Sequence, residues 1–178
     1  KRPSKPPYHH GDLPRALVAA ATRLIEDGAG AQVTLRAAAE AAGVSIAAPY
    51  RHFESREALL AGVLIEGFHE LTRCMEDARA AATEPLAALA ATGLAYVRFA
   101  ADRPALYRLM FSPACDKAAF PELMGAGHAS LAVLQDSVRG ARQQLGITDE
   151  AVARVALSGW SLTHGLASLY VDGLLADA

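Results

Sequence analysis

The chain has 178 residues, of which 52% are hydrophobic and 6% aromatic, and its formal net charge is −2 at pH 7. This length is enough for one or two units with a real core, and no apolar run approaches the roughly 20 residues of a membrane span. Richness in Ala and Leu favours an all-α protein. The two cysteines, Cys74 and Cys115, have no metal-like spacing. We therefore expect a cytoplasmic protein with reduced cysteines and without a metal, cofactor or membrane partner.

The charge is distributed unevenly along the chain. Residues 1–56 hold 8 Lys/Arg and 5 Asp/Glu, whereas residues 57–178 hold 9 and 14. A positive end on an acidic body fits a DNA-binding head, although chance surface variation gives the same pattern. Residues 1–11 are basic and proline-rich, so we expect a flexible arm. It either reaches along a groove or phosphate of DNA or is an idle solvated tail.

The first helix is predicted to start near Asp12 and to end at Gly28 and Gly30, with apolar side chains at helical spacing on one face. Thr34 then caps a short Ala-rich helix, and Gly43 is placed to leave it at positive φ. We expect the first helix to pack across the elements that follow it and to close a three-helix head.

A second short helix is predicted over Ile46–His52, with Ser45 as its cap. Two short helices joined by a glycine turn are typical of a helix-turn-helix, whose second helix enters the major groove of DNA. Small or apolar residues at its start allow close approach to bases, and donors at its end suit phosphates. The predicted DNA-binding residues are Thr34, Arg36, Ser45, Ile46, Ala47, Ala48, Tyr50, Arg51, His52 and Arg56.

Several of these residues have a plain structural alternative. Thr34 and Ser45 are helix caps first, Tyr50 could be a core aromatic, and Arg36 and Arg51 could be ordinary solvated charges. Their placement in the motif favours DNA contact.

Five further helices are expected in the rest of the chain. Ser55 caps a long one that ends near Ala82, and prolines or cap residues open the others. Their predicted ranges are 85–101, a short helix ending at Phe111, 121–145, and a last helix from a Thr148 cap to about Gly173, with a loop over 112–120.

An aromatic, Met and His cluster in these helices could line an apolar ligand pocket or simply fill a core. The candidate ligand-binding residues are Phe99, Arg103, Tyr107, Met110, Phe111, Met124, His128, Trp160 and His164. One face of the last helix, with small residues nearby, predicts a homodimer through a four-helix bundle, the alternative being packing within one chain. The candidate interface residues are Leu157, Ser161, His164, Ser168 and Val171.

The first third of the chain resembles the N-terminal domain of the TetR family of bacterial transcriptional regulators. The resemblance rests on the segments 27–30, 33–39, 42–45, 50–53 and 55–60. Trp160 with His164-Gly165 is similar to the C-terminal domain of a branch named for a Trp-His-Gly pattern. Many members carry a glycine and a non-proline residue where this chain has Ala47-Ala48-Pro49.

The resemblance implies a DNA-binding domain over 12–56 and a helical effector-binding and dimerisation domain over 57–178. It implies a regulator, most simply a repressor, that binds a palindromic operator on double-stranded DNA and responds to a small-molecule effector held between body helices. It also implies that the long linking helix transmits ligand binding to the head.

Enzyme motifs are missing: there is no G-x-S-x-G, phosphate loop or C-x-x-C, so we expect no catalytic residues. The alternative is a small-molecule-binding or enzymatic helical body whose head is vestigial. A third possibility is a DNA-binding protein that has no effector and acts through protein partners.

Overall fold

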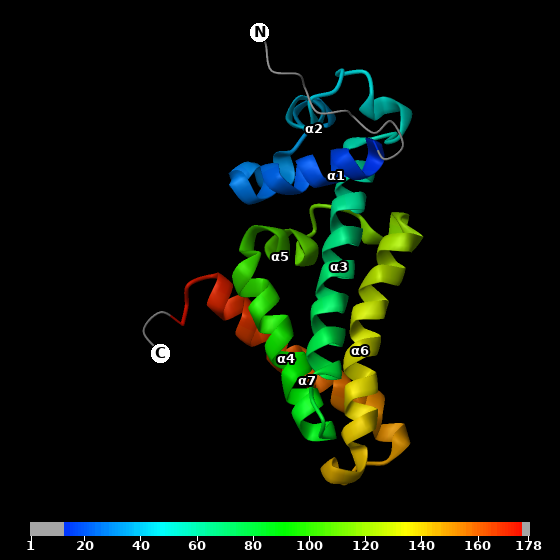
Figure 1. The fold of residues 1–178 in the computed structure, drawn as a ribbon, viewed down its shortest axis with the longest axis vertical. Coiled ribbons are helices and arrows are strands. Elements are labelled where there is room, and N and C mark those ends of the chain that lie inside the picture. Colours follow the sequence, from blue (N-terminus) through cyan, green and yellow to red (C-terminus); the bar gives the residue numbers. More distant parts are fainter. Residues whose placement is uncertain (1–12, 176–178) are drawn as a thin grey trace.

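The computed structural model describes residues 13–175, and all regular structure in that part of the chain is helical. A small head of α1 and α2 lies above an elongated body, and the long helix α3 joins the two (Figure 1). The all-α prediction is therefore confirmed. The predicted Asp12 cap and the basic arm lie outside the described residues.

The head begins with α1 (Leu13–Leu24), which crosses the upper end of α3. It passes into a π turn, Ile25–Ala29, in which Gly28 has φ 105°, and then into a 3-10 turn over Gly30–Gln32. The predicted end of the first helix at these glycines is confirmed. Positive φ is a conformation that glycine adopts at little cost, whereas a β-carbon would be strained there.

The helix α2 (Leu35–Ala42) has the two end signals that the sequence predicts. The side chain of Thr34 accepts a hydrogen bond from the amide of Ala37 at 3.1 Å, which satisfies one of the free donors of the first turn. Gly43 closes the helix at φ 70°, and its amide donates to the carbonyls of Ala39 and Glu40. Leu35, Ala38 and Ala39 face the core.

The predicted α-helix over Ile46–His52 is wrong. Residues 46–48 form a turn, in which the amide of Ala48 donates to the carbonyl of Ser45, and a 3-10 turn follows over Pro49–Arg51. An α-helix would need a bond from residue 49 to the Ser45 carbonyl, and proline has no N–H to donate. The N-cap of the 3-10 turn is Ala48 and not Ser45.

The body contains five α-helices within the described residues. Ser55 caps α3 by accepting from the amide of Ala58 at 3.1 Å, as predicted, and prolines occupy the first turn of three of the helices. The bounds are α3 (Arg56–Ala80), α4 (Pro85–Asp102), α5 (Pro104–Phe111), α6 (Pro121–Leu145) and α7 (Val152–Val171).

Two turns differ from the prediction for the body. The expected loop over 112–120 contains a 3-10 turn, Lys117–Ala119. Thr148 does not cap the last helix, because a 3-10 turn over Asp149–Ala151 comes between them and the Thr148 side chain accepts no backbone hydrogen bond. The predicted stop of α6 at Gly146 is confirmed, with φ 65°.

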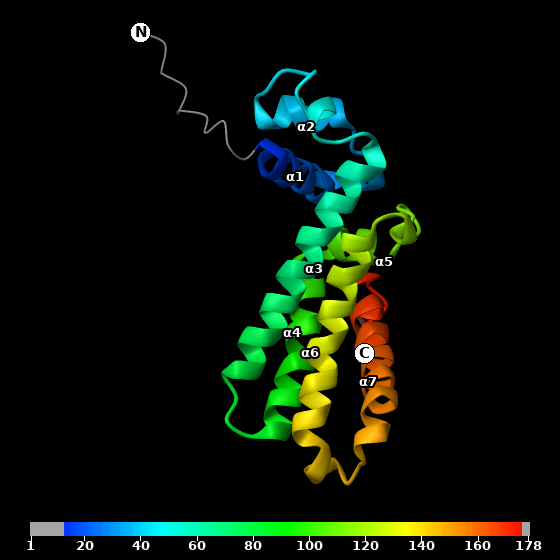
Figure 2. The same cartoon turned by 90° about the vertical axis from the view of Figure 1, so that its right-hand side faces the viewer.

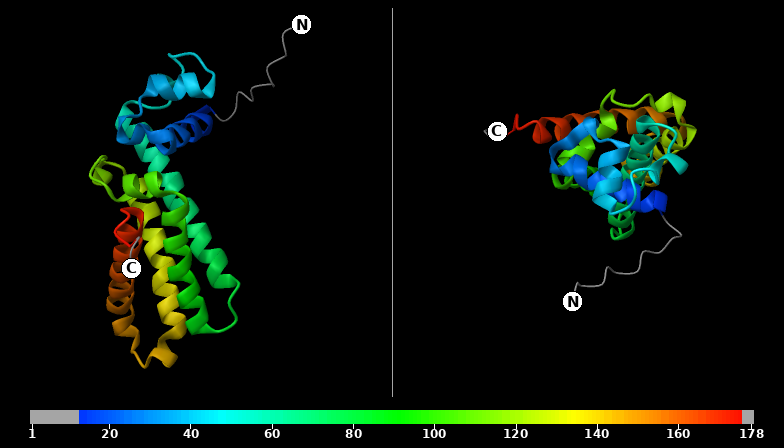
Figure 3. Two further views of the ribbon diagram at one scale, coloured as in Figure 1. Left: turned by 90° about the vertical axis from the view of Figure 1, so that its left-hand side faces the viewer. Right: turned by 90° about the horizontal axis from the view of Figure 1, so that it is seen from above.

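The core is continuous from head to body, and α3 contributes to it along its length. In Figure 2 α3 descends from the head beside α4 and α6, and α7 lies on the other side of α6. Figure 3 gives the opposite side and the view from above, in which the head covers one end of the body. At the junction, a β-carbon on Gly62 would lie 3.0 Å from Cγ2 of Val18, so the glycine lets α1 pack closely on α3.

Candidate functional site

The turn segment of the head presents a mixed surface to solvent. Ile46 is 46% exposed and Tyr50 is 61% exposed, although large apolar side chains are usually covered. Arg51 and His52 are also exposed, whereas Pro49 is buried against the head. Pro49 thus anchors the segment, and the side chains on both sides of it are free to meet a partner.

A polar hollow of about 340 Å³ lies between this segment and the start of α1. Its lining combines the polar side chains Ser45, Arg51 and His52 with the small residues Ala47 and Ala48, and Leu13 and Pro14 close the other side. The fold therefore brings together five of the ten predicted DNA-contact residues around one hollow. A hydroxyl, a guanidinium and an imidazole in one hollow are groups that bind phosphate oxygens.

Three other predicted head residues, Thr34, Arg36 and Arg56, have internal hydrogen-bond partners. Nε of Arg36 lies 2.9 Å from Oε1 of Glu40 on the exposed face of α2. Arg56 donates from one guanidinium nitrogen to the carbonyl of Ala31 and from the other to Glu57, 3.1 Å away. Arg56 therefore ties the connection after α1 to the first turn of α3, which is a structural role that the sequence did not indicate.

A cavity of about 360 Å³ lies in the body. Its walls come from α3, α4, α5, α6 and α7 and from the turn before α6, and most of the lining is apolar. The lining residues are Phe68, Leu71, Met75, Thr92, Gly93, Tyr96, Met110, Phe111, Lys117, Gly127, His128, Ser130, Leu131, Leu134, Trp160 and Thr163. Cavities of this size and character are typical small-molecule sites.

Four of the nine predicted ligand residues line this cavity: Met110, Phe111, His128 and Trp160. The structure places the other five elsewhere. Phe99 is buried in the core, Met124 is exposed on α6, and Arg103 pairs with Glu26 and Glu70. Tyr107 and His164 form a layer behind the cavity wall, in contact with Phe111 and Trp160.

That layer is a hydrogen-bonded cluster of two phenols and an imidazole. The hydroxyls of Tyr96 and Tyr107 each lie 2.8 Å from Nδ1 of His164, and the Tyr107 hydroxyl also lies 3.3 Å from Oγ of Ser168. Burial raises the pKa of Tyr96 and lowers that of His164. Burial therefore favours the protonated phenol of Tyr96 and the neutral ring of His164, and an unprotonated Nδ1 has one lone pair, so it accepts from one hydroxyl at a time.

Several lining residues were not predicted from the sequence. Phe68, Leu71 and Met75 form the apolar stripe of α3, which by itself predicts only packing. Lys117 could have been singled out in the sequence, because it is the only lysine after residue 5. Its side chain lines a mostly apolar cavity, and Nζ lies 2.7 Å from the carbonyl of Ser112.

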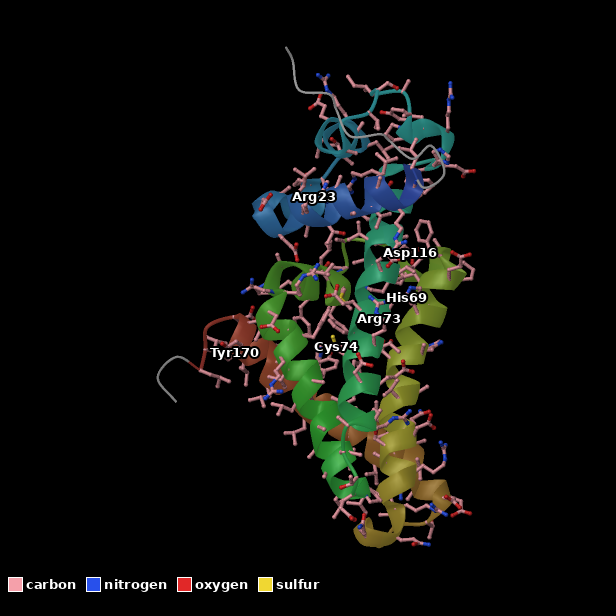
Figure 4. The ribbon with its side chains drawn as sticks, in the orientation of Figure 1. Arg23, His69, Arg73, Cys74, Asp116 and Tyr170 are labelled. Carbon is pink, nitrogen blue, oxygen red and sulfur yellow. The ribbon has the colours of Figure 1, made fainter. Side chains whose placement is uncertain are left out.

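The outer face of α7 is unusually apolar. Leu162 is 78% exposed, and further large apolar side chains follow it on the same face; the outward Tyr170 is labelled in Figure 4. Among the predicted interface residues, His164 and Ser168 turn inward to Tyr107, whereas Leu157 and Ser161 are exposed. The exposed stripe consists of Leu162, Leu166, Leu169 and Tyr170.

No helix in residues 13–175 is long and apolar enough to cross a membrane. In the same part of the chain, no group of three or more His, Cys, Asp or Glu side chains is arranged to hold a metal ion.

In the head, α2, the turn at Gly43 and the 3-10 turn over Pro49–Arg51 occupy the places of the two helices and the turn of a helix-turn-helix, which is a DNA-binding class of fold. Residues 17–63 match the family described as bacterial regulatory proteins, tetR family, and residues 89–178 match the tetracyclin repressor-like C-terminal domain. The chain belongs to the TetR family and is a DNA-binding transcription regulator. The Trp-His-Gly branch stays a prediction.

Solved structures share this fold. A protein of unknown function from Rhodococcus sp. RHA1 is 36% identical, with a TM-score of 0.82 over 98% of this chain and 90% of that one. A TetR family transcription regulator from Marinobacter aquaeolei VT8 is 18% identical, with a TM-score of 0.63 over 90% and 84%. The fatty acid degradation regulator FadR from Bacillus halodurans is 16% identical, with a TM-score of 0.72 over 96% and 88%. The last two show likeness of fold alone. No curated protein matches the sequence.

Proposed function

We propose that this regulator is a homodimeric, ligand-responsive repressor that binds a palindromic operator and is released or weakened by a small molecule in its body. One observation carries the proposal: a single helix, α3, serves both sites. Ser55 caps it directly after the exposed turn segment, and Phe68, Leu71 and Met75, further along, line the cavity. A ligand that moves α3 therefore changes the position of the head.

The dimer is supported by apolar surface that one chain leaves uncovered. The stripe on α7 is too large and too continuous for scattered surface leucines. The neighbouring helix α6 exposes small residues, which permit close approach of another helix: Gly125, Ala129, Ala132 and Gly140. Two helices from each subunit would bury both faces in a four-helix bundle.

The symmetry of the dimer would determine the symmetry of the DNA site. A two-fold pair of heads meets successive major grooves when their centres are about 34–36 Å apart, which makes the operator a palindrome. A ligand that binds one spacing of the heads better than another shifts the population that can bind DNA. Repression is the simplest outcome, because a bound dimer occupies the site that polymerase or an activator needs.

The experiment is selection of bound DNA from a random pool at physiological salt, followed by sequencing. An enriched palindrome with half-sites about one helical turn apart supports the proposal. No enrichment over bulk competitor contradicts the operator and the dimeric docking together. The recovered site then provides the assay for ligand effects, in which a loss of DNA affinity on ligand addition supports release.

The alternative of an enzymatic body with a vestigial head gains no support from the cluster behind the cavity. Nδ1 of His164 contacts two phenols, and Oγ of Ser168 contacts Tyr107 rather than a ring nitrogen. A nucleophile needs a base within hydrogen-bonding reach, and here the imidazole is occupied by the tyrosines.

A further inference from the structure

The charges around the body cavity are one-sided. Of the described residues that line it, none is acidic, and Lys117 is the one with a permanent positive charge. Among residues 13–175 no carboxylate lies within salt-bridge distance of its Nζ. A partly buried ammonium beside apolar walls is costly unless a counter-charge reaches it.

The ammonium of Lys117 has donors to spare. It carries three N–H groups, and the described contacts use one of them, to the carbonyl of Ser112 at 2.7 Å. That bond fixes the amine at the cavity wall without neutralising it. Two donors therefore remain for an anionic oxygen that enters the cavity.

Three of the four hydroxyls in the lining, those of Thr92, Tyr96 and Ser130, are already engaged with the protein, whereas Thr163 has no hydrogen bond among the described residues. Oγ1 of Thr92 lies 2.8 Å from the carbonyl of Ala88 and 3.0 Å from Oγ of Ser137. Oγ of Ser130 lies 2.8 Å from Oγ1 of Thr72. Each hydroxyl has one proton to give, so these groups offer a ligand acceptors more than donors. Lys117 is the group that selects charge.

We propose that the ligand of this cavity is an amphipathic carboxylate, with its anionic group at Lys117 and its apolar body along Phe68, Leu71, Leu131 and Leu134. This inference rests on the proposed function, since it names the chemistry of the proposed effector. The apolar lining supplies binding through burial, and the charge-assisted hydrogen bond to the ammonium selects an acid over a neutral molecule of the same length.

The position of Lys117 also links this anion to the head. The segment after α5 that holds Lys117 lies at the upper end of the body, where Figure 4 labels Asp116 beside α3. An anion at Lys117 therefore binds in a cavity walled by α3, the helix that carries the head.

The test uses three probes of one chain length: decanoate, decanol and decylammonium. Trp160 is the only tryptophan and lines the cavity, so its fluorescence in the full-length protein reports binding. We expect decanoate to bind about tenfold or more tightly than decanol, as one charge-assisted hydrogen bond implies, and decylammonium to bind weakest. Equal binding of decanoate and decanol, or preference for the cation, overturns the carboxylate assignment.

Two substitutions locate the anion. Lys117→Met keeps the length and apolar stem of the side chain and should weaken decanoate about tenfold while leaving decanol unchanged. Arg154→Met removes a cation from the exposed start of α7 and should leave all three probes unchanged. A Lys117→Met protein with wild-type decanoate affinity, or equal losses in both variants, overturns the site.

The outcomes separate this inference from the proposed function. If decanol or decylammonium binds as well as decanoate and changes operator affinity, the effector site stands and the ligand class is wrong. If no probe changes either Trp160 fluorescence or operator binding, the carboxylate assignment fails. A selected palindrome would still stand in that case, because DNA selection requires no ligand.

Discussion

The guanidinium of Arg103 donates to the carboxylate of Glu70, with Nη1 and Oε1 2.6 Å apart. Its Nε donates at the same time to Glu26. Arg103 lies at the corner between α4 and α5, Glu70 on α3, and Glu26 in the π turn after α1. One side chain therefore joins the body, the linking helix and the head, and two carboxylates satisfy it in a partly buried position.

Replacing Arg103 by methionine tests the strength of this contact. We expect Arg103→Met to lower the free energy of unfolding by about 1 kcal/mol, because it leaves two partly buried carboxylates without their cation, while their remaining exposure reduces the loss. Urea denaturation measures it. Arg36→Met, which breaks the exposed pair with Glu40, is the matched control and should cost less than about 0.5 kcal/mol. Equal losses of unfolding free energy in the two variants would mean that the Arg103 contact stabilises the fold no more than an exposed ion pair does.

The pH dependence of stability tests the cluster behind the cavity. Burial lowers the pKa of His164 from its ordinary value of 6.5. Below that value the unfolded chain takes up a proton that the folded chain resists, so the unfolded state binds more protons and stability falls as pH falls. The stability that comes from holding His164 neutral is complete above about pH 6.5 and is lost as the pH falls below that value.

The measurement is urea denaturation at about pH 7.5 and about pH 5.5. His164→Gln should lose less stability between these values than the wild type, because glutamine does not titrate. His69→Gln, which removes an exposed histidine of α3, should behave as the wild type does. A His164→Gln protein with unchanged pH dependence would show that the imidazole is not held neutral in the fold.

The helices were predictable because their ends carry strong local signals. Thr34 and Ser55 as caps, Gly43 and Gly146 as stops and the prolines at 85, 104 and 121 fixed most boundaries to within a few residues. The turn segment differs from the prediction because Pro49 removes the one donor that an α-helix needs there. That signal is present in the sequence, but the prediction gave more weight to the helix-turn-helix pattern around it.

The cavity was harder to predict than the fold. Packing an apolar stripe and lining an apolar cavity require the same residue types at the same spacing, so Phe68 and Met75 read as core. Only the tertiary arrangement distinguishes Tyr107, which lies behind the wall, from Tyr96, which lines it. The outward stripe of α7 likewise depends on which side α4 and α6 cover.

Salt dependence tests the role of the turn segment in DNA binding. Arg51 is exposed and lines the polar hollow. If it contacts one phosphate, Arg51→Ala should weaken operator binding and reduce the slope of log K against log salt by about one. Fluorescence anisotropy with the selected operator over a range of salt concentrations measures both. Arg154→Ala, a distant exposed cation, should leave the slope unchanged, and an unchanged slope for Arg51→Ala would remove it from the phosphate contacts.

The apolar stripe of α7 makes a separate prediction about assembly. Burying a leucine is worth about 2 kcal/mol, and a two-fold interface loses that amount once from each subunit. Leu162→Glu, which also places two like charges near the axis, should therefore raise the dimer dissociation constant on the order of a thousandfold. Sedimentation velocity over a range of protein concentrations measures it. Leu86→Glu changes an exposed leucine at the start of α4 and should leave the dimer intact. If Leu162→Glu stays dimeric, the stripe is not the interface, and the exposed leucines of α7 need another partner.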